Sequence, residues 1–382
     1  MADGMLQIRR GASRSADPVS AVAELHAALD QPDAALVIVF CSSAYDLVAL
    51  GAELRRRFGA TPVIGCTTAG EITPLGYLSG SLTGVSLGAS GFRAVTRAIP
   101  RLSEFKFVDG AEVGRELLQQ LRQRGKPPSG SNSFGFLLID GLSNQEENVV
   151  STLSRSLGDV PLFGGSAADG AKFEATHVYC DGEFRSDAAV FTLVQTEHPF
   201  VVFKTQHFVS SAQKMVVTRA DPARRIVTEI NGEPAAREYA FQVGLDVDRL
   251  TPHIFAAHPV VVKVGGLHYV RSIQKVNPDG SLTFFCAIDE GIVLTVARGV
   301  DLVENLEQAF DEVRGKIGTP ELVIGCDCIL RLLELEQKSI KQEAARVFLD
   351  NNVVGFSTYG EQFNAMHVNQ TFTGVAIGGG AP

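Results

Sequence analysis

The segments VIGCTTAGE, residues 63–71, and VVGFSTYGE, residues 353–361, are two copies of one motif. Gly, Thr, Gly and Glu recur in register after the same β-branched pair. LTGVSLGA, residues 82–89, and FTGVAIGG, residues 372–379, follow the two copies at the same spacing. A motif that is repeated together with its spacing indicates a duplicated structural unit.

A weaker third copy, VPLFGGSAADG at residues 160–170, lies between the first two. Each copy follows an apolar strand pattern and a helical pattern, and a further helical pattern precedes each strand. The predicted strands lie in LVIVFCSS, FGFLLIDGLS and ELVIGCDC, and the predicted helices cover residues 19–29, the segment ending at Phe58, and residues 111–124, 144–157, 302–317 and 330–351. The sequence therefore predicts an α/β fold of three repeated helix–strand–helix–strand–strand units.

A segment of different character separates the second and third units, from Phe200 to roughly Gly299. It contains alternating strand-like runs such as VVFKTQHFV, PVVVKVGG and SLTFFCAI, and an Asn-Pro-Asp-Gly turn at residues 277–280. We expect a β-rich insertion here.

Composition excludes several classes of partner. The chain has 382 residues, of which 45% are apolar, and a formal net charge of -9. This charge gives no electrostatic reason to bind nucleic acid or an anionic membrane. The N-terminus has no apolar signal region, and no apolar run is long enough to span a bilayer, so a cytoplasmic protein is expected.

Loops beyond the carboxyl ends of strands are where α/β units bind ligands. The repeats place polar and small residues there. They are Ser42, Ser43 and residues 66–71 from the first unit, residues 140–144 and 165–170 from the second, and residues 326–328 and 357–361 from the third.

Motifs of catalysis are largely missing from the sequence. No dinucleotide fingerprint, phosphate loop or metal-ligand histidine spacing occurs. The stretch from Gly164 to Ala168 begins like the nucleophile elbow of a hydrolase, but Ala replaces the final Gly, and Asp169 and Gly170 follow where a helix should begin. We expect a protein that is not an enzyme, with a serine hydrolase acting through Ser166 as an alternative.

The segments VIGCTTAGE, LFGGSAADG, EINGEPAAREYA, GCDCILR and VVGFSTYGEQFNAMHVNQTFTGVA resemble the FIST family, whose members pair an N-terminal and a C-terminal FIST domain. The resemblance implies a FIST N-type domain over residues 15–225 and a FIST C-type domain over residues 226–365, whose last strand continues to about residue 380. FIST proteins are sensory modules of signal transduction, so the resemblance implies a small-ligand sensor.

Two segments, TQHF at residues 205–208 and GEQFNAMHVNQTFTGVA at residues 360–376, are similar to the NosP branch of haem-binding nitric oxide sensors. This resemblance implies haem b, nitric oxide as ligand and control of a separate histidine kinase or cyclic-di-GMP enzyme, and it leaves a homo-oligomer open. A neutral imidazole suits ferrous haem. His367 is the first candidate for the axial iron ligand and His207 the alternative, with Met366 and Tyr359 as candidate pocket residues.

Three alternatives remain at this point. The first is a haem-free FIST sensor of an amino acid or similar metabolite that binds at the loop ends. The second is the hydrolase that uses Ser166. The third is an interaction scaffold without a ligand, for which no ligand would change the melting temperature.

Overall fold

Three six-stranded sheets form the body of the protein in the computed structural model, which describes residues 7–264 and 266–380. Each sheet is built on a parallel pair of strands and continues through two antiparallel strands on one side. Sheet one contains β3 (Val63–Thr68), β2 (Ala34–Ser42), β6 (Leu82–Gly88) and β1 (Ile8–Ser13). Sheet two contains β9 (Leu162–Ser166), β8 (Ser133–Ile139), β12 (Ala188–Thr196) and β7 (Phe92–Pro100). Sheet three contains β23 (Val353–Thr358), β22 (Pro320–Cys328), β26 (Thr371–Gly378) and β13 (Phe200–Gln206).

A short hairpin from a different unit completes each sheet. The hairpins are β4 (Glu71–Thr73) with β5 (Gly76–Leu78), β10 (Val178–Cys180) with β11 (Glu183–Arg185), and β24 (Glu361–Phe363) with β25 (Met366–Val368). The first pairs with β23 in sheet three, the second with β3 in sheet one and the third with β9 in sheet two. The units therefore exchange hairpins cyclically, and no sheet is complete without another unit.

The repeated motif has a structural explanation at its first glycine. This glycine lies where the two parallel strands approach so closely that a Cβ would clash with a carbonyl oxygen of the neighbouring strand. The three contacts are Gly65 against Val39, Gly164 against Leu137 and Gly355 against Gly325. Glycine is the residue that permits such a close backbone approach.

The repeated threonine and glutamate close the hairpins. The buried Glu71 carboxylate accepts hydrogen bonds from Thr68 Oγ1 at 2.5 Å, Ser81 Oγ at 2.6 Å and Ser81 N at 3.1 Å. Glu361 is bound in the same way, by Thr358 Oγ1, by Thr371 Oγ1 at 2.8 Å and by Thr371 N at 3.2 Å. These polar residues thus hold the hairpin to the strand that follows it.

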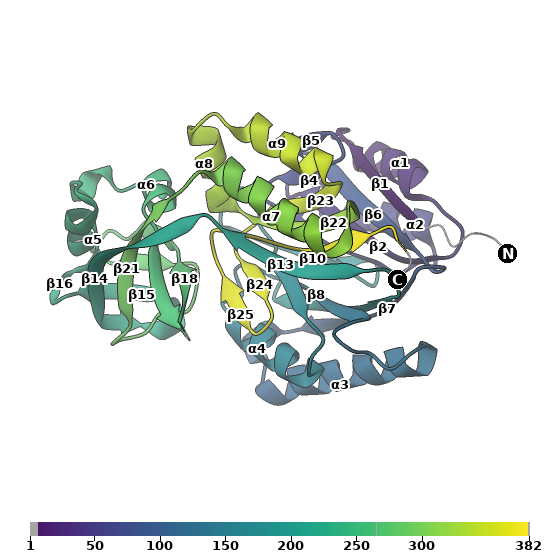
Figure 1. Cartoon of the computed structure of the whole chain (residues 1–382), viewed down its shortest axis with the longest axis horizontal. Helices are drawn as coiled ribbons and strands as arrows, with labels where there is room; N and C mark the ends of the chain where they lie inside the picture. The colour runs from purple at the N-terminus through teal and green to yellow at the C-terminus, as the bar shows by residue number, and fades with distance from the viewer. Residues whose placement is uncertain (1–6, 265, 381–382) are drawn as a thin grey trace.

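The inner faces of all three sheets share one core. Phe40 of sheet one stacks on Phe356 of sheet three at 4.6 Å between ring centroids, and Phe136 stacks on Phe163 at 4.7 Å within sheet two. The outer faces are covered by helices, as Figure 1 shows at the right, bottom and top of the body. These helices are α1 (Pro18–Leu29), α2 (Leu47–Phe58), α3 (Phe107–Arg124), α4 (Glu146–Leu157), α7 (Leu302–Ile317), α8 (Ile329–Gln337) and α9 (Lys341–Asp350).

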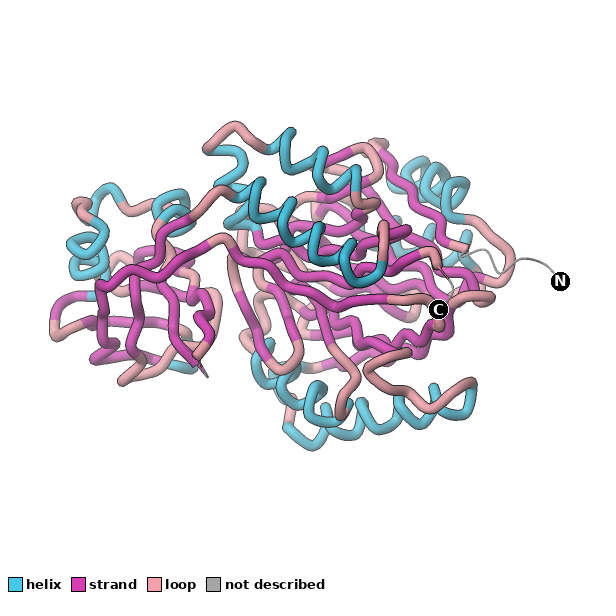
Figure 2. The backbone as a smooth tube through the Cα atoms, viewed as in Figure 1, coloured by secondary structure: helices cyan, strands magenta, loops and turns pink. Residues whose placement is uncertain are grey.

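Residues 208–299 form a separate β-rich lobe with its own core, at the left of Figures 1 and 2. Its strands are β14 (Phe208–Asp221), β15 (Ile226–Ile230), β16 (Glu233–Pro234), β17 (Val260–Val264), β18 (Leu267–Arg271), β19 (Ile273–Val276), β20 (Leu282–Phe284) and β21 (Val293–Gly299), and its helices are α5 (Ala235–Val243) and α6 (Pro252–Ala257). The chain enters the lobe from β13 and leaves it towards α7.

The mixed α/β class agrees with the prediction, whereas the element order of each unit is longer than predicted. Every unit begins with an additional strand and carries the exchanged hairpin before its last strand. One of these leading strands, β13, falls in the segment assigned to the insertion. The helix predicted over residues 330–351 is two helices, because Ser339 has a φ of 57° and interrupts it. Within the described residues, no helix combines the length and the apolar character that a membrane span requires.

Candidate ligand site at the junction of body and lobe

The loops at the carboxyl ends of the body strands meet the lobe in an apolar cluster. Phe285 and Ala256 of the lobe pack there with residues that follow β9, β22 and β23. The body contributes Ala168, Cys328, Ile329, Leu330 and Tyr359, with Leu142 and Phe173 at the edge. A ligand bound at this junction would contact both parts of the molecule.

Tyr359 fixes the loop that follows β9. Its hydroxyl group donates to the Asp169 carboxylate and lies 2.8 Å from Gly170 O, and its ring stacks on Phe173 at 4.6 Å. Asp169 also accepts the backbone N–H groups of Phe173, Glu174 and Ala175, each at 2.9 Å. Tyr359 is buried and supports the loop.

His367 is buried in the hairpin β24–β25, with 2% of its surface exposed. Its Nδ1 lies 3.3 Å from Gln362 Nε2, and its Nε2 has no hydrogen-bond partner among the described residues. Burial lowers the pKa of His367 to about 4. The Glu147 carboxylate and a contact with the Phe285 backbone oppose this shift, and Arg225 and Arg271 add to it; the Phe285 contact does not meet the geometry of a hydrogen bond. The imidazole is therefore neutral near pH 7.

Further unpaired polar atoms belong to the same hairpin and to the turn that follows it. Gln362 Oε1, both amide atoms of Asn369 and Gln370 Oε1 lack partners within the described part of the chain, and all three side chains are fully buried. Gln370 Nε2 donates to Ala256 O of the lobe at 2.9 Å. We call the group of His367, Gln362, Asn369 and Gln370 the polar pocket, although none of the five cavities described in this structure is lined by these buried side chains. Buried polar atoms are nearly always paired, so a group of unpaired ones indicates a bound water, ion or ligand.

Comparison of the three hairpins shows that this polarity is specific to the third. Each hairpin presents one cross-strand pair whose first residue lies opposite the close-packed glycine of its sheet. The pairs are Ile72 with Tyr77, Tyr179 with Phe184, and Gln362 with His367. Two pairs are apolar or aromatic, as a helix-covered face requires, and only the third is polar. Departures from a structural rule of this kind concentrate at functional sites.

A buried ion cluster joins the lobe to α4 beside the polar pocket. Arg225 of the lobe binds Glu146 at 2.8 Å, Glu147 at 2.6 Å and the Phe285 carbonyl at 2.6 Å. Glu147 also accepts the backbone N–H of Ala287 at 2.6 Å. Burial raises the pKa of Glu146 to about 7, although the Arg225 guanidinium opposes this shift. Glu147 raises the pKa of His367 and Arg225 lowers it, so the pKa of this histidine depends on where the lobe places Arg225.

Comparison with known proteins identifies the family. Residues 35–233 match the FIST N domain model and residues 235–364 match the FIST C domain model. The chain belongs to the FIST family. FIST domains are sensory domains for small ligands, which is the general role of this chain. Membership of the NosP branch is a proposal.

Two further comparisons give weaker similarities. An uncharacterised protein of Methanocaldococcus jannaschii is 22% identical over 356 residues, which cover 82% of the FIST chain and 67% of that protein. Among solved structures, a cyanuric acid hydrolase aligns over 98% of this chain and 100% of its own with 9% identity and a TM-score of 0.38. A likeness of this strength assigns neither fold nor activity.

His207, the alternative axial ligand, lies where the FIST chain passes from β13 into the lobe and is fully buried. Arg331 Nη1 donates to its Nδ1 at 2.9 Å, so its Nε2 carries the proton and donates to Glu334 at 2.7 Å. Arg331 in turn binds Asp327 at 2.6 Å, and Asp327 accepts from Tyr77 at 2.5 Å. With both ring nitrogens bound, His207 has no free atom for iron and does not fit a haem ligand.

His367 has the chemistry of an axial ligand, because its Nε2 is unpaired and its ring is neutral, but it is buried and lines none of the five described cavities, so haem would need the surrounding side chains to move. Met366 is half-buried next to it in β25, so their side chains point to opposite faces of the hairpin. Met366 therefore does not line the polar pocket with His367.

Ser166, the alternative nucleophile, is the last residue of β9 and is fully buried. Its Oγ accepts from Gln362 Nε2 at 3.0 Å. A loop follows it where a nucleophile elbow would continue into a helix.

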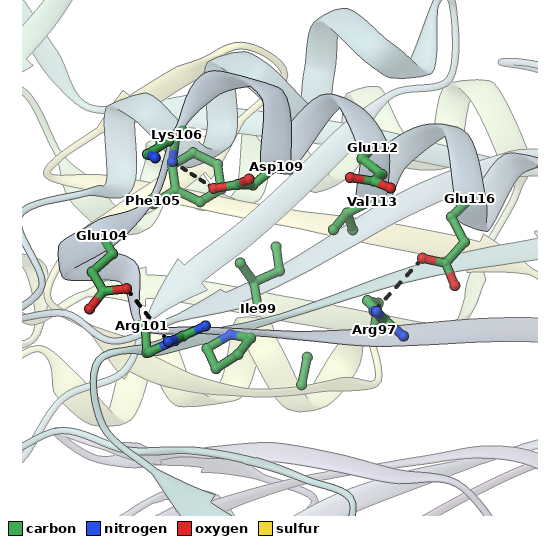
Figure 3. A pocket seen from close by; sticks show the side chains of 12 residues that line it. Arg97, Ile99, Arg101, Glu104, Phe105, Lys106, Asp109, Glu112, Val113 and Glu116 are labelled. Atoms are coloured by element: carbon green, nitrogen blue, oxygen red, sulfur yellow. Dashed lines mark hydrogen bonds and ion pairs between the residues drawn. The ribbon is translucent and has the colours of Figure 1, made fainter.

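A groove of about 770 Å³ lies between α3 and β7 (Figure 3). Both of its arginines pair with glutamates of the same groove, Arg97 with Glu116 at 3.8 Å and Arg101 with Glu104 at 3.6 Å. It receives no residue from the lobe. We therefore place the candidate site at the junction.

Proposed function

We propose that this FIST chain binds a small ligand in the polar pocket and reports its presence through the lobe. The observation that carries the proposal is the replacement of an apolar hairpin pair by Gln362 and His367, with polar atoms left unpaired in a fully buried position. An unpaired buried polar atom costs about 1–3 kcal/mol. A ligand that binds these atoms recovers that free energy.

The signal would pass through the contacts between the pocket and the lobe. Gln370 donates to Ala256 of the lobe, and Arg225 of the lobe binds Glu147 on α4, a helix that contacts β25. A ligand that prefers one arrangement of these contacts shifts the population towards it. The output is a change in lobe position that a partner protein reads.

The more specific proposal is a haem-based nitric oxide sensor of the NosP type. His367 would hold haem b through its free Nε2, and nitric oxide binding is the chemistry that haem iron supplies. The neutral, unpaired imidazole supports this proposal. The reader of the signal would be a histidine kinase or a cyclic-di-GMP enzyme, and no catalytic role is proposed for the chain itself.

A haem-free sensor of an amino acid or similar metabolite is the second candidate. The three amide side chains of the polar pocket favour it, because each amide offers both a donor and an acceptor. Such a set suits a ligand that carries an amino group and a carboxylate.

One set of measurements tests both candidates. The wild type is titrated with haem, its ferrous spectrum is recorded before and after nitric oxide, and its melting temperature is measured with each common amino acid. For a haem sensor we expect a Soret band that shifts with nitric oxide, is lost in His367→Ala and returns when free imidazole is added. The His207→Ala variant is the control and should keep the band.

The outcomes separate the candidates. A Soret band that persists in His367→Ala would show that haem does not bind at His367. Absence of haem uptake together with stabilisation by an amino acid, lost in His367→Ala, would establish the metabolite sensor; a ligand at 100 times its Kd stabilises by about 2.7 kcal/mol. No response to either class would contradict a ligand site at the hairpin.

A further inference from the structure

A cavity of about 420 Å³ lies between the body and the lobe, beside the ion cluster. The body contributes the loop after β8 and the loop around Phe173, and the lobe contributes β19, β20 and the turn before β15. It is lined by Gly141, Leu142, Asn144, Lys172, Phe173, Arg224, Arg225, Gln274, Lys275, Thr283, Phe284 and Phe285. Its volume falls in the range of pockets for small metabolites, roughly 300–1,000 Å³.

The charges that line this cavity are all positive. Lys172 comes from the body, and Arg224 and Lys275 come from the lobe. None of these three side chains forms an ion pair within residues 7–264 and 266–380, and no carboxylate lines the cavity. The fourth cation, Arg225, is already neutralised by Glu146 and Glu147. Like charges brought together from two parts of a molecule repel, so the cavity attracts an anion.

The backbone around the cavity is held in an uncommon conformation. Asn144, Phe173 and Arg225 have φ values of 57°, 56° and 54°, in the left-handed region. Asparagine tolerates this region, whereas for a bulky residue such as Phe173 it costs free energy. The stacking of Phe173 on Tyr359 and the hydrogen bond from its N–H to Asp169 maintain the conformation.

We propose that this cavity binds a small molecule with at least two negative charges, which joins Lys172 of the body to Arg224 and Lys275 of the lobe. Phe173 and Phe285 provide an apolar surface for the rest of the molecule. The site shares no lining residue with the polar pocket, so it does not depend on the function proposed above.

Two simple dianions serve as probes. Calorimetric titrations of the full chain with succinate and with inorganic phosphate should give saturable binding at millimolar concentrations, and the uncharged analogue succinamide should give none. Binding should weaken as the ionic strength is raised. Binding of only one of the two probes also supports the site and identifies the anionic group that it prefers.

Variants assign the binding to the cavity. Lys172→Gln removes the cation of the body and Lys275→Gln one cation of the lobe, and each should weaken probe binding about tenfold. Lys316→Gln removes an exposed, unpaired cation of α7 and is the control, for which we expect unchanged binding. All three positions are exposed, so the variants should fold.

Two results would overturn the proposal. One is that neither probe binds the wild type saturably, and the other is that Lys172→Gln with Lys275→Gln binds as the wild type does. Neither result bears on the polar pocket, because that pocket is tested with haem, amino acids and His367→Ala.

Discussion

The repeated glutamate shows how one residue can serve the fold and set a pH dependence. Burial raises the pKa of Glu361 to about 8 from its ordinary value of 4.5, against the hydrogen bonds from Thr358 and Thr371. The folded protein therefore holds a proton that the unfolded chain releases between these two pH values. It follows that this residue's contribution to stability is full below pH 4.5 and decreases as the pH rises towards 8.

Replacement of this carboxyl group tests the sign of the effect. Glu361 lowers the free energy of unfolding as the pH rises from about 5 to about 8, and Glu361→Gln should lack this effect. Between these pH values, the variant's free energy of unfolding should therefore rise relative to that of the wild type by about 1.4 kcal/mol per pH unit. Urea unfolding at several pH values measures it. Glu104→Gln, at an exposed position, should follow the wild type. An unchanged slope in Glu361→Gln would mean that this carboxyl group is ionised in the folded state.

At the scale of elements, the hairpin β24–β25 combines a structural role with the candidate site. It pairs with β9 in sheet two, as the other hairpins pair with their sheets, but it carries Gln362 and His367 where they carry apolar pairs. Stability and ligand binding thus place opposite demands on the same two positions.

Replacement of the polar pair by an apolar pair, as in the other hairpins, tests the effects on stability and on ligand binding separately. The double variant Gln362→Ile with His367→Phe follows the apolar pattern of the other hairpins. We expect a gain of about 1–2 kcal/mol in its free energy of unfolding, because removal of the unpaired polar atoms outweighs loss of the hydrogen bond from Gln362 to Ser166. The ligand response should be lost at the same time. Chemical unfolding and ligand-dependent melting measure the two effects. A destabilised variant would show that the polar side chains are satisfied within the protein.

The sequence made some of these elements predictable and concealed others for physical reasons. The buried strands could be predicted because their apolar runs and the close-packed glycine recur in the chain. The hairpin strands have three residues each, which is too short for a readable alternation. The leading strand β13 continues almost directly into β14 of the lobe, so no turn marks the boundary.

Prediction of the site was limited in the same way. The strand-end argument selected the loops of Tyr359 and Asp169, and the structure brings these residues into contact. The partners of His207 on α8 and of Arg225 on α4 come from distant parts of the sequence, so no local pattern reveals that His207 has both nitrogens bound. The unpaired atoms of the polar pocket are visible only after packing is known.

At the scale of the whole molecule, the three units depend on one another. Sheet two is completed by residues 361–368, and the hairpin of the first unit has its partner strand at residues 353–358. The shared core also needs Leu322, Ile324 and Phe356 from the third unit. The boundary between the FIST N and FIST C matches is therefore not a boundary between independent folding units.

A fragment tests this dependence. Residues 1–233, which include the whole FIST N match, should lack a cooperative thermal transition, because two of the exchanged hairpin contacts and the third unit's share of the core are removed. Circular dichroism of the fragment and of the full chain measures this. A sharp, reversible transition in the fragment would contradict the interdependence.

The exchange of hairpins also has a consequence for synthesis of the protein. The β4–β5 hairpin leaves the ribosome long before β23, its partner in sheet three, has been translated. At about 5–20 residues per second this delay is on the order of tens of seconds. During that time Ile72, which is fully buried in the finished protein, has no sheet to cover it. The nascent chain therefore needs protection from aggregation until translation is almost complete, and chaperones that bind exposed apolar segments can supply it.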